Sequence, residues 1–207
     1  LIKPDEFYTK GLYQAARPDD IASWRAKYPD IAEALDEQDR LKAEGKLPPT
    51  IDINTEERKE LRLDIVKELY GKGAKKKEKQ AYLIIGLPAS GKSSMANPLE
   101  AETGSLIVDS DMAKERLPEF IESDGRRADQ VHLESQVIAE EVLKIAMNNG
   151  DNIVLPIVGK SEKSIMSKYD RLKEAGYDVH LRLVDLTNEK TIERAVNRYR
   201  ETGRLVP

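Results

Sequence analysis

Apolar residues in the second half of the chain fall into four short runs, which are 82–85, 106–108, 153–158 and 179–184. The segments between and after these runs have the apolar spacing of helices, and they cover 92–101, 129–148, 162–175 and 188–201. Such alternation predicts an α/β fold, with a parallel sheet flanked by helices on both faces. Ligands of such sheets bind beyond the carboxyl ends of the strands, so the residues that follow each run are the first candidates for a site.

Residues 1–73 show helical patterns and no strand pattern. We expect a first helix over 21–28 and a second one that starts at Pro29 and runs to Ala43. A third helix starts at the Thr55 cap, and its apolar stripe at four-residue spacing consists of Leu61, Ile65 and Leu69. This helical N-terminal region is expected to pack on the rest of the chain; a separate binding module is the alternative.

A basic, lysine-rich segment at 74–80 separates the helical region from the strand-containing domain at 81–207. We interpret this segment as a solvated linker, because charge runs are more often solvated than bound to nucleic acid. The chain starts at Leu1 rather than Met and stops abruptly at Pro207, which predicts that it belongs to a longer protein truncated at its C-terminus.

The segment after the first apolar run matches the phosphate-binding motif G-x-x-x-x-G-K-[ST]. The candidate nucleotide-binding residues here are Gly86, Leu87, Pro88, Ala89, Ser90, Gly91, Lys92, Ser93 and Ser94. A strand precedes them and a helix follows, which is the order that a phosphate cradle requires. Backbone N–H groups of the loop face phosphate oxygens, Lys92 reaches the β- and γ-phosphates, and Ser93 holds Mg²⁺. The sequence therefore predicts a site for ATP and Mg²⁺.

Two carboxylates, Asp109 and Asp111, follow the second apolar run. A parallel sheet brings them beside the phosphate loop, where phosphoryl transfer to a hydroxyl needs a carboxylate near the acceptor and a further ligand for Mg²⁺. We expect Asp111 to be catalytic. Asp109 is a candidate metal ligand and equally a candidate helix cap.

Arginines gather on and after the last predicted helix, at Arg194, Arg198, Arg200 and Arg204. Arg194 and Arg198 are four residues apart and hence on one helix face, and guanidinium groups suit phosphate oxygens. We expect Arg198 to act in catalysis and Arg194 and Arg204 to bind the nucleotide; solvated helix charge is the competing interpretation.

His132 and Glu134 lie near the start of the long helix and are candidates for substrate contact. A lone His is more often structural, and a zinc site is not expected in a chain with two His and no Cys.

The composition excludes several other classes of function. Charged residues make up 35% of the chain, yet the net charge is only −4, so no basic nucleic-acid-binding face is expected. The absence of Cys excludes disulfides and thiolate metal sites. No apolar run approaches the length of a membrane span, and no secretory signal is present. These features predict a soluble cytoplasmic protein that binds neither nucleic acid nor a membrane.

Residues 81–207 resemble the zeta toxin family of P-loop kinases. Besides the phosphate loop, the resemblance rests on Asp111 with Lys114 and Pro118, on Gly176-Tyr177-Asp178-Val179 leading into a strand, and on Arg194 and Arg198-Tyr199 ahead of Gly203-Arg204. Well-known members phosphorylate a sugar hydroxyl of UDP-N-acetylglucosamine with ATP and Mg²⁺, and an antitoxin protein often opposes them. The resemblance implies that Asp111 is the base, that Lys92 and the late arginines contact phosphates and that Ser93 contacts the metal.

Two departures concern the acceptor side. The family usually carries an acidic residue followed by Gly-Thr at the end of the third core strand, where this chain has Pro156-Ile157-Val158-Gly159. The family pattern also favours Arg where this chain has Lys114, which we count among the substrate-binding candidates with Asp111, His132 and Glu134.

The sequence thus favours an ATP-dependent kinase that phosphorylates a hydroxyl of a small molecule, such as a nucleotide sugar, with a toxin role and an antitoxin partner implied by the resemblance. Three alternatives stay open: a nucleotide-binding regulatory module that has lost catalysis, a metabolite kinase similar to shikimate kinases, and a polynucleotide kinase, which ranks last because no basic groove is expected.

Overall fold

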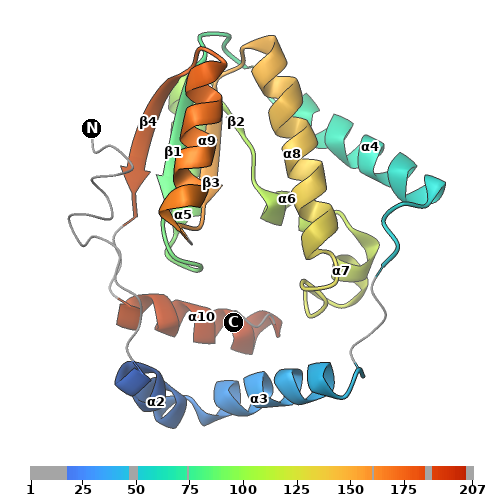
Figure 1. The fold of residues 1–207 in the computed structure, drawn as a ribbon, viewed down its shortest axis with the longest axis vertical. Coiled ribbons are helices and arrows are strands. Elements are labelled where there is room, and N and C mark those ends of the chain that lie inside the picture. Colours follow the sequence, from blue (N-terminus) through green and yellow to red (C-terminus); the bar gives the residue numbers. More distant parts are fainter. Residues whose placement is uncertain (1–17, 47–50, 74, 160, 185–187, 204–207) are drawn as a thin grey trace.

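Four parallel strands form the sheet of the computed structural model, in the order β2-β3-β1-β4 (Figure 1). The structure describes residues 18–46, 51–73, 75–159, 161–184 and 188–203. The strands are β1 (Gln80–Ile85), β2 (Leu106–Ile107), β3 (Ile153–Ile157) and β4 (Asp178–Leu183). The central strand β1 pairs with β3 on one side and with β4 on the other. The expected α/β fold with a parallel sheet is confirmed.

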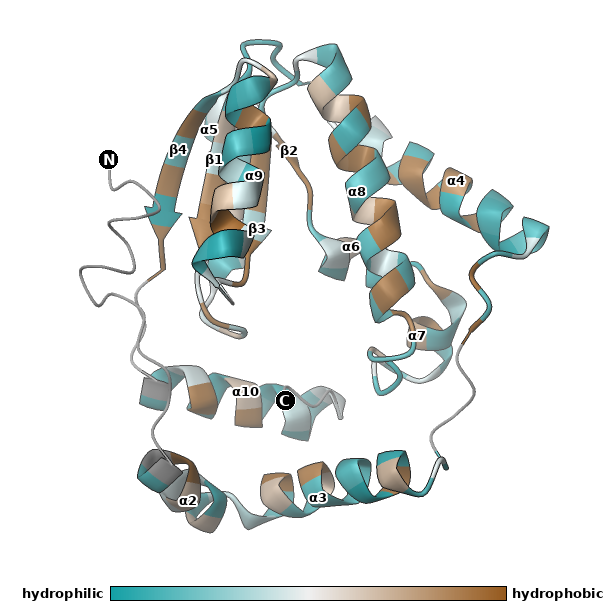
Figure 2. Cartoon of the chain, viewed as in Figure 1, coloured by the Kyte–Doolittle hydropathy of each residue, from teal (hydrophilic) through white to brown (hydrophobic). Residues whose placement is uncertain are grey.

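Helices cover both faces of the sheet because buried residues of β1 point alternately to opposite sides. Ile84 packs in one cluster with Ala96 of α5 (Lys92–Thr103). Leu83 and Ile85 face the other side, where α8 (His132–Asn149) and α9 (Glu162–Glu174) lie. β1, β2 and β3 are hydrophobic along most of their length, whereas β4 and the helices alternate between apolar and polar residues (Figure 2).

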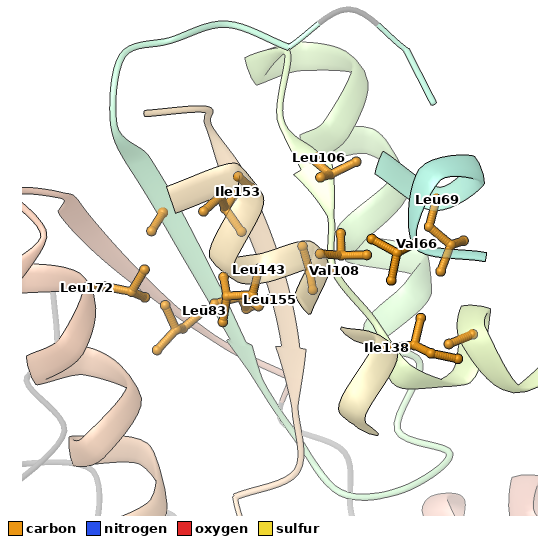
Figure 3. Close-up of a cluster of buried hydrophobic side chains, with 14 of the residues drawn as sticks. Val66, Leu69, Leu83, Leu106, Val108, Ile138, Leu143, Ile153, Leu155 and Leu172 are labelled. Carbon is orange, nitrogen blue, oxygen red and sulfur yellow. The ribbon is translucent and has the colours of Figure 1, made fainter. Parts of the chain in front are cut away.

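The main hydrophobic core lies between the sheet and α8 (Figure 3). Leu83, Ile153 and Ile138 are fully buried there. Tyr177, which directly precedes β4, is also buried, and its hydroxyl donates to the backbone oxygens of Ala146 and Asp151. Burial raises the pKa of Tyr177 to about 12.

Two five-residue helices, α6 (Ser110–Lys114) and α7 (Pro118–Glu122), follow β2. A helix capped by an aspartate was considered at the position of α6, whereas α7 was not predicted. Such short helices show no apolar periodicity, and only their first residues signal them: the Asp109 side chain caps α6, and Pro118 starts α7. The long helix α8 begins at His132 rather than at Asp129. The helix α5 continues through Pro98, whose ring is exposed to solvent.

The N-terminal region contains α2 (Pro18–Lys27), α3 (Pro29–Ala43) and α4 (Glu56–Gly71). Ile65, Val66 and Leu69 of α4 are buried in the main core, so this helix packs on the sheet domain as expected. By contrast, α2 and α3 lie beside α10 (Asn188–Thr202), away from the sheet (Figure 1).

The basic segment before β1 keeps its lysine side chains mostly exposed, but its backbone is fixed by the buried Asn152. The Asn152 Oδ1 accepts from the N–H groups of Glu78 and Gln80, both at 3.1 Å. Its Nδ2 donates to the backbone oxygen of Thr103 at the end of α5, at 3.1 Å. The segment is therefore bound to the amino end of the sheet over these residues, although its lysines are solvated as expected.

No helix in the described part of the chain is long and apolar enough to cross a membrane.

Candidate functional site

The phosphate loop connects β1 to α5 at the carboxyl edge of the sheet, where the sequence predicts it. Its turn needs glycine at two positions. A Cβ at Gly86 would lie 2.6 Å from the Ser90 Oγ, and Gly91, which precedes α5, has a φ of +91°. Within the loop, the N–H of Ser90 donates to the backbone oxygen of Leu87. The loop therefore has the close-wound backbone that turns successive N–H groups toward a bound anion.

The Lys92 ammonium donates to the backbone oxygens of Gly86 at 2.9 Å and Leu87 at 2.7 Å, so it folds back over its own loop. Burial lowers the pKa of Lys92, whereas the charges of Asp109 and Asp111 raise it. The side chains of Ser93 and Ser94 are exposed at the start of α5. The lysine thus lies within electrostatic range of both candidate carboxylates.

Asp109 ends the segment after β2, and its Oδ1 accepts from the N–H of Asp111 at 2.9 Å. It is therefore the cap of α6, which was one of the two roles considered for it. Burial raises the pKa of Asp109, while the N–H from Asp111 and the charges of Lys92 and Lys114 act in the opposite direction. A bound metal ion would offset the desolvation cost of the buried, charged Asp109 carboxylate. Asp109 could therefore cap α6 and contact a metal ion at the same time.

Asp111 lies in the first turn of α6, and its side chain is 42% exposed. The Nζ of Lys114 bonds its Oδ1 at 3.0 Å, and only 7% of the Lys114 side chain is exposed. Part of the Asp111 carboxylate is thus exposed to solvent, while the helix that carries it is held by the Asp109 cap and by the buried Lys114 side chain.

The last helix brings one arginine onto the phosphate loop. The Arg194 Nη1 donates to the backbone oxygen of Ser90 at 3.0 Å, and a Cβ at Gly91 would lie 2.7 Å from the same nitrogen. Arg198, one turn further along α10, is half-buried, and its positive charge contributes to the lowered pKa of Lys92. The predicted contact at Arg204 lies outside the described residues.

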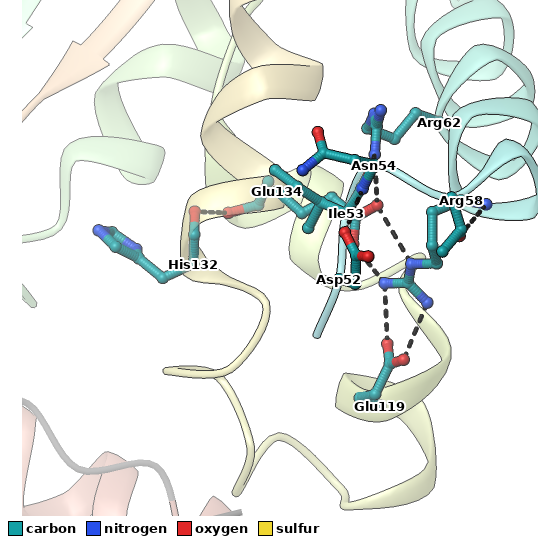
Figure 4. Close-up of polar contacts among 10 residues, drawn as sticks. Asp52, Ile53, Asn54, Arg58, Arg62, Glu119, His132 and Glu134 are labelled. Carbon is teal, nitrogen blue, oxygen red and sulfur yellow. Dashed lines mark hydrogen bonds and ion pairs between the residues drawn. The ribbon is translucent and has the colours of Figure 1, made fainter. Parts of the chain in front are cut away.

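Glu134, a predicted substrate contact, is fully buried and paired with two arginines of α4 (Figure 4). Arg58 bonds both Glu134 oxygens, and the Arg62 Nη1 reaches the Glu134 Oε1 at 3.1 Å. Arg58 also binds Glu119 of α7, with its Nη1 at 2.8 Å from the Glu119 Oε1. These contacts favour a structural role for Glu134; substrate contact stays a prediction.

The side chain of His132 is exposed at the start of α8, where its Nε2 lies 3.1 Å from the Gln136 Nε2. Pro156 of β3 pairs with Ile84 in the sheet, close to the phosphate loop. The four residues 156–159 contain no acid, so this strand end offers no carboxylate to an acceptor.

The pairing of Arg58 and Arg62 with Glu134 was missed by the sequence analysis. A signal for it exists, because these arginines lie four residues apart and continue the buried stripe of Ile65 and Leu69 toward the start of α4. Charged residues on an apolar stripe need buried partners of opposite charge.

The comparisons with known proteins agree with the fold. A family model described as zeta toxin matches residues 67–207. Among solved structures, a chain of the PezAT chromosomal toxin-antitoxin system of Streptococcus pneumoniae is similar, with 19% identity and a TM-score of 0.59. The match covers 69% of this chain and 62% of that chain, so it spans less than two thirds of the solved protein. A search of curated protein sequences found no match.

Proposed function

Because this chain belongs to the zeta toxin family, we propose that it is an ATP-dependent kinase that phosphorylates a hydroxyl group of a small molecule. The observation that carries the proposal is the cluster of charges at the carboxyl edge of the sheet. The phosphate-loop Lys92 lies within electrostatic range of Asp109, Asp111 and Arg198, so the groups for binding a triphosphate and for activating a hydroxyl are in one place.

Three observations support the fit of this site to a triphosphate and Mg²⁺. Gly86 and Gly91 stand where a Cβ would clash with neighbouring atoms, α5 starts at the loop with Lys92, and the buried Ser90 Oγ has no hydrogen-bond partner among the described residues. Mg²⁺-bound ATP would supply the phosphoryl group there and neutralise part of the charge that develops during transfer. Ser93 and Asp109 are the proposed metal contacts, and Ser94 belongs to the same helix start.

Each charged residue has a proposed part in the reaction. Asp111 accepts the proton of the attacking hydroxyl as the new O–P bond forms and the bond to the departing diphosphate breaks. Lys92 leaves its two loop carbonyls and binds the β- and γ-phosphates. Arg194 binds the nucleotide, and Arg198 stabilises the charge on the transferring group, with Arg204 as a further phosphate contact.

The proposed acceptor is a nucleotide sugar such as UDP-N-acetylglucosamine, on the strength of the family resemblance. Lys114 and His132 are the further acceptor candidates beside Asp111. The solved relative belongs to a toxin-antitoxin system, which supports a toxin role and an antitoxin partner for this protein as well. A cytoplasmic location stays part of the proposal.

The test compares the wild type with Asp111→Asn and with the control Asp170→Asn, an exposed carboxylate on α9. Each protein receives labelled ATP, Mg²⁺, UDP-N-acetylglucosamine and, separately, a metabolite extract. We expect Asp111→Asn to lose roughly a hundredfold or more of the transfer rate while its affinity for ATP stays within about threefold, because a general base contributes about that much. Equal transfer by this variant would remove Asp111 from the reaction.

A regulatory nucleotide-binding module that has lost catalysis is the second candidate. Pro156 favours it, because this position offers no acid to an acceptor. This alternative predicts tight ATP binding and no labelled product from either acceptor source.

A further inference from the structure

We propose that Lys114 is a positioning residue that holds the carboxylate of Asp111, rather than a residue that binds the acceptor. The inference rests on the proposed kinase function and assigns a role inside its site. It replaces the acceptor contact that the sequence resemblance suggests for this position.

The geometry of α6 directs Lys114 at Asp111. The two residues are three apart and hence one helical turn from each other, and the ammonium lies 3.0 Å from the Asp111 Oδ1. Asp109 caps the start of the helix, and the backbone oxygen of Lys114 accepts from the N–H of the fully buried Leu117. Both ends of the short helix are therefore fixed, and so is the backbone position from which the Lys114 side chain extends.

Burial separates the tasks of the two side chains. Only 7% of the Lys114 side chain is exposed, against 42% of the Asp111 side chain, so an acceptor in solvent meets the carboxylate and not the ammonium. If Lys114 turned outward to an acceptor, it would lose its bond to the Asp111 Oδ1 and have to leave a largely buried position. Direct acceptor binding by Lys114 is thus the costlier arrangement.

The charges around Lys114 support the same assignment. Besides its bond to the Asp111 Oδ1, the Lys114 ammonium interacts electrostatically with the buried Asp109 carboxylate. Lys92 and Lys114 flank Asp109 and Asp111 as two cations beside two anions, with Arg198 as an additional positive charge near Lys92.

The test uses Lys114→Met, the conservative variant Lys114→Arg, and the control Lys144→Met. Lys144 forms a similar one-turn ion pair, with its Nζ 2.7 Å from the Glu141 Oε1, on the exposed side of α8. Lys114→Met should fold, because Met has a similar length and Asp111 remains partly hydrated. Phosphorylation of UDP-N-acetylglucosamine, or of the acceptor found in the extract, is measured at varied concentrations of both substrates.

We expect Lys114→Met to lower kcat roughly tenfold to a hundredfold with both KM values within about twofold, because the orientation of the base is lost but binding is not. Lys114→Arg should recover most of the loss, and Lys144→Met should match the wild type. A higher KM for the acceptor with unchanged kcat would mean that Lys114 binds the acceptor. Unchanged kcat and KM would remove it from the site.

A structural measurement separates this inference from the kinase proposal. If the wild type phosphorylates nothing, crystal structures of the wild type and Lys114→Met still show whether the Asp111 carboxylate changes its rotamer. An identical rotamer in both would overturn the positioning role, and a changed one would support it. If Lys114→Met does not fold, Lys114→Gln takes its place in both measurements, because it removes the charge and keeps a hydrogen-bonding group.

Discussion

Two parts of the N-terminal region, α4 and the pair α2–α3, attach to the rest of the molecule in different ways. α4 buries Ile65, Val66 and Leu69, and its Arg58 pairs with the fully buried Glu134. α3 has no buried residue. Exposed ion pairs join α2 and α3 to α10, the shortest joining Arg200 and Asp30 at 3.0 Å.

Helices with similar sequence patterns therefore contribute differently to the stability of the protein. Buried apolar side chains stabilise by about 1.5 to 3 kcal/mol each, whereas exposed ion pairs are screened by water and salt. α4 therefore contributes to the stability of the sheet domain through its buried side chains, although it lies before the linker segment in the sequence. α2 and α3 are held by contacts that a change of conditions weakens.

The largest effect is expected from Arg58→Met, which tests the buried ion pair of α4. The variant leaves Glu134 buried with Arg62 as its remaining arginine partner among the described residues. We expect a loss of about 3 kcal/mol in the free energy of unfolding, because the buried Glu134 charge is then only partly compensated by Arg62. Urea unfolding followed by circular dichroism measures it.

The control for Arg58→Met is Arg25→Met, which removes a two-bond ion pair with Asp36 between exposed side chains. The urea concentration at the midpoint of unfolding should be close to the wild-type value in Arg25→Met. Similar losses in both variants would contradict the distinction between the buried and exposed ion pairs.

Leu69→Ala tests the apolar attachment of α4. We expect a loss of about 2 to 4 kcal/mol, because Leu69 is buried in the main core and its truncation leaves a cavity. Leu35→Ala in α3, where the side chain is only half-buried, should cost less than half as much. Equal losses in thermal and urea unfolding would show that α3 is as firmly packed as α4.

The smallest effect is expected from Lys27→Ala. The Lys27 Nζ lies 3.6 Å from the Glu189 Oε1 and 3.8 Å from the Glu193 Oε1, and all three side chains are exposed. The melting temperature should not change measurably at 0.15 M salt, because the ions already screen such pairs. A clear fall in the melting temperature, measured by calorimetry, would mean that the attachment of α2 to α10 is stronger than its exposure suggests.

The sequence predicted the features that depend on neighbouring residues. The phosphate loop and the strand before it are local, and so is the capping role considered for Asp109. The parallel sheet followed from the alternation of strands and helices.

The features that escaped prediction depend on residues far apart in the chain. Arg58 and Glu134 are separated by 76 positions, so no short window of the sequence contains both partners. The extent of α4's packing was missed for the same reason. Its apolar stripe was visible, but the surface that it covers is assembled only when α8 folds onto the sheet.

The hydrogen bonds of the Asn152 side chain bear on which substitutions the sheet can accept. One buried amide joins the entry to β1 and the end of α5, all at the sheet edge opposite the phosphate loop. These hydrogen bonds therefore lie at the end of the strands away from the residues proposed to bind the nucleotide. A substitution at the phosphate-loop end of the sheet, such as one at Pro156, should therefore leave the hydrogen bonds of Asn152 intact.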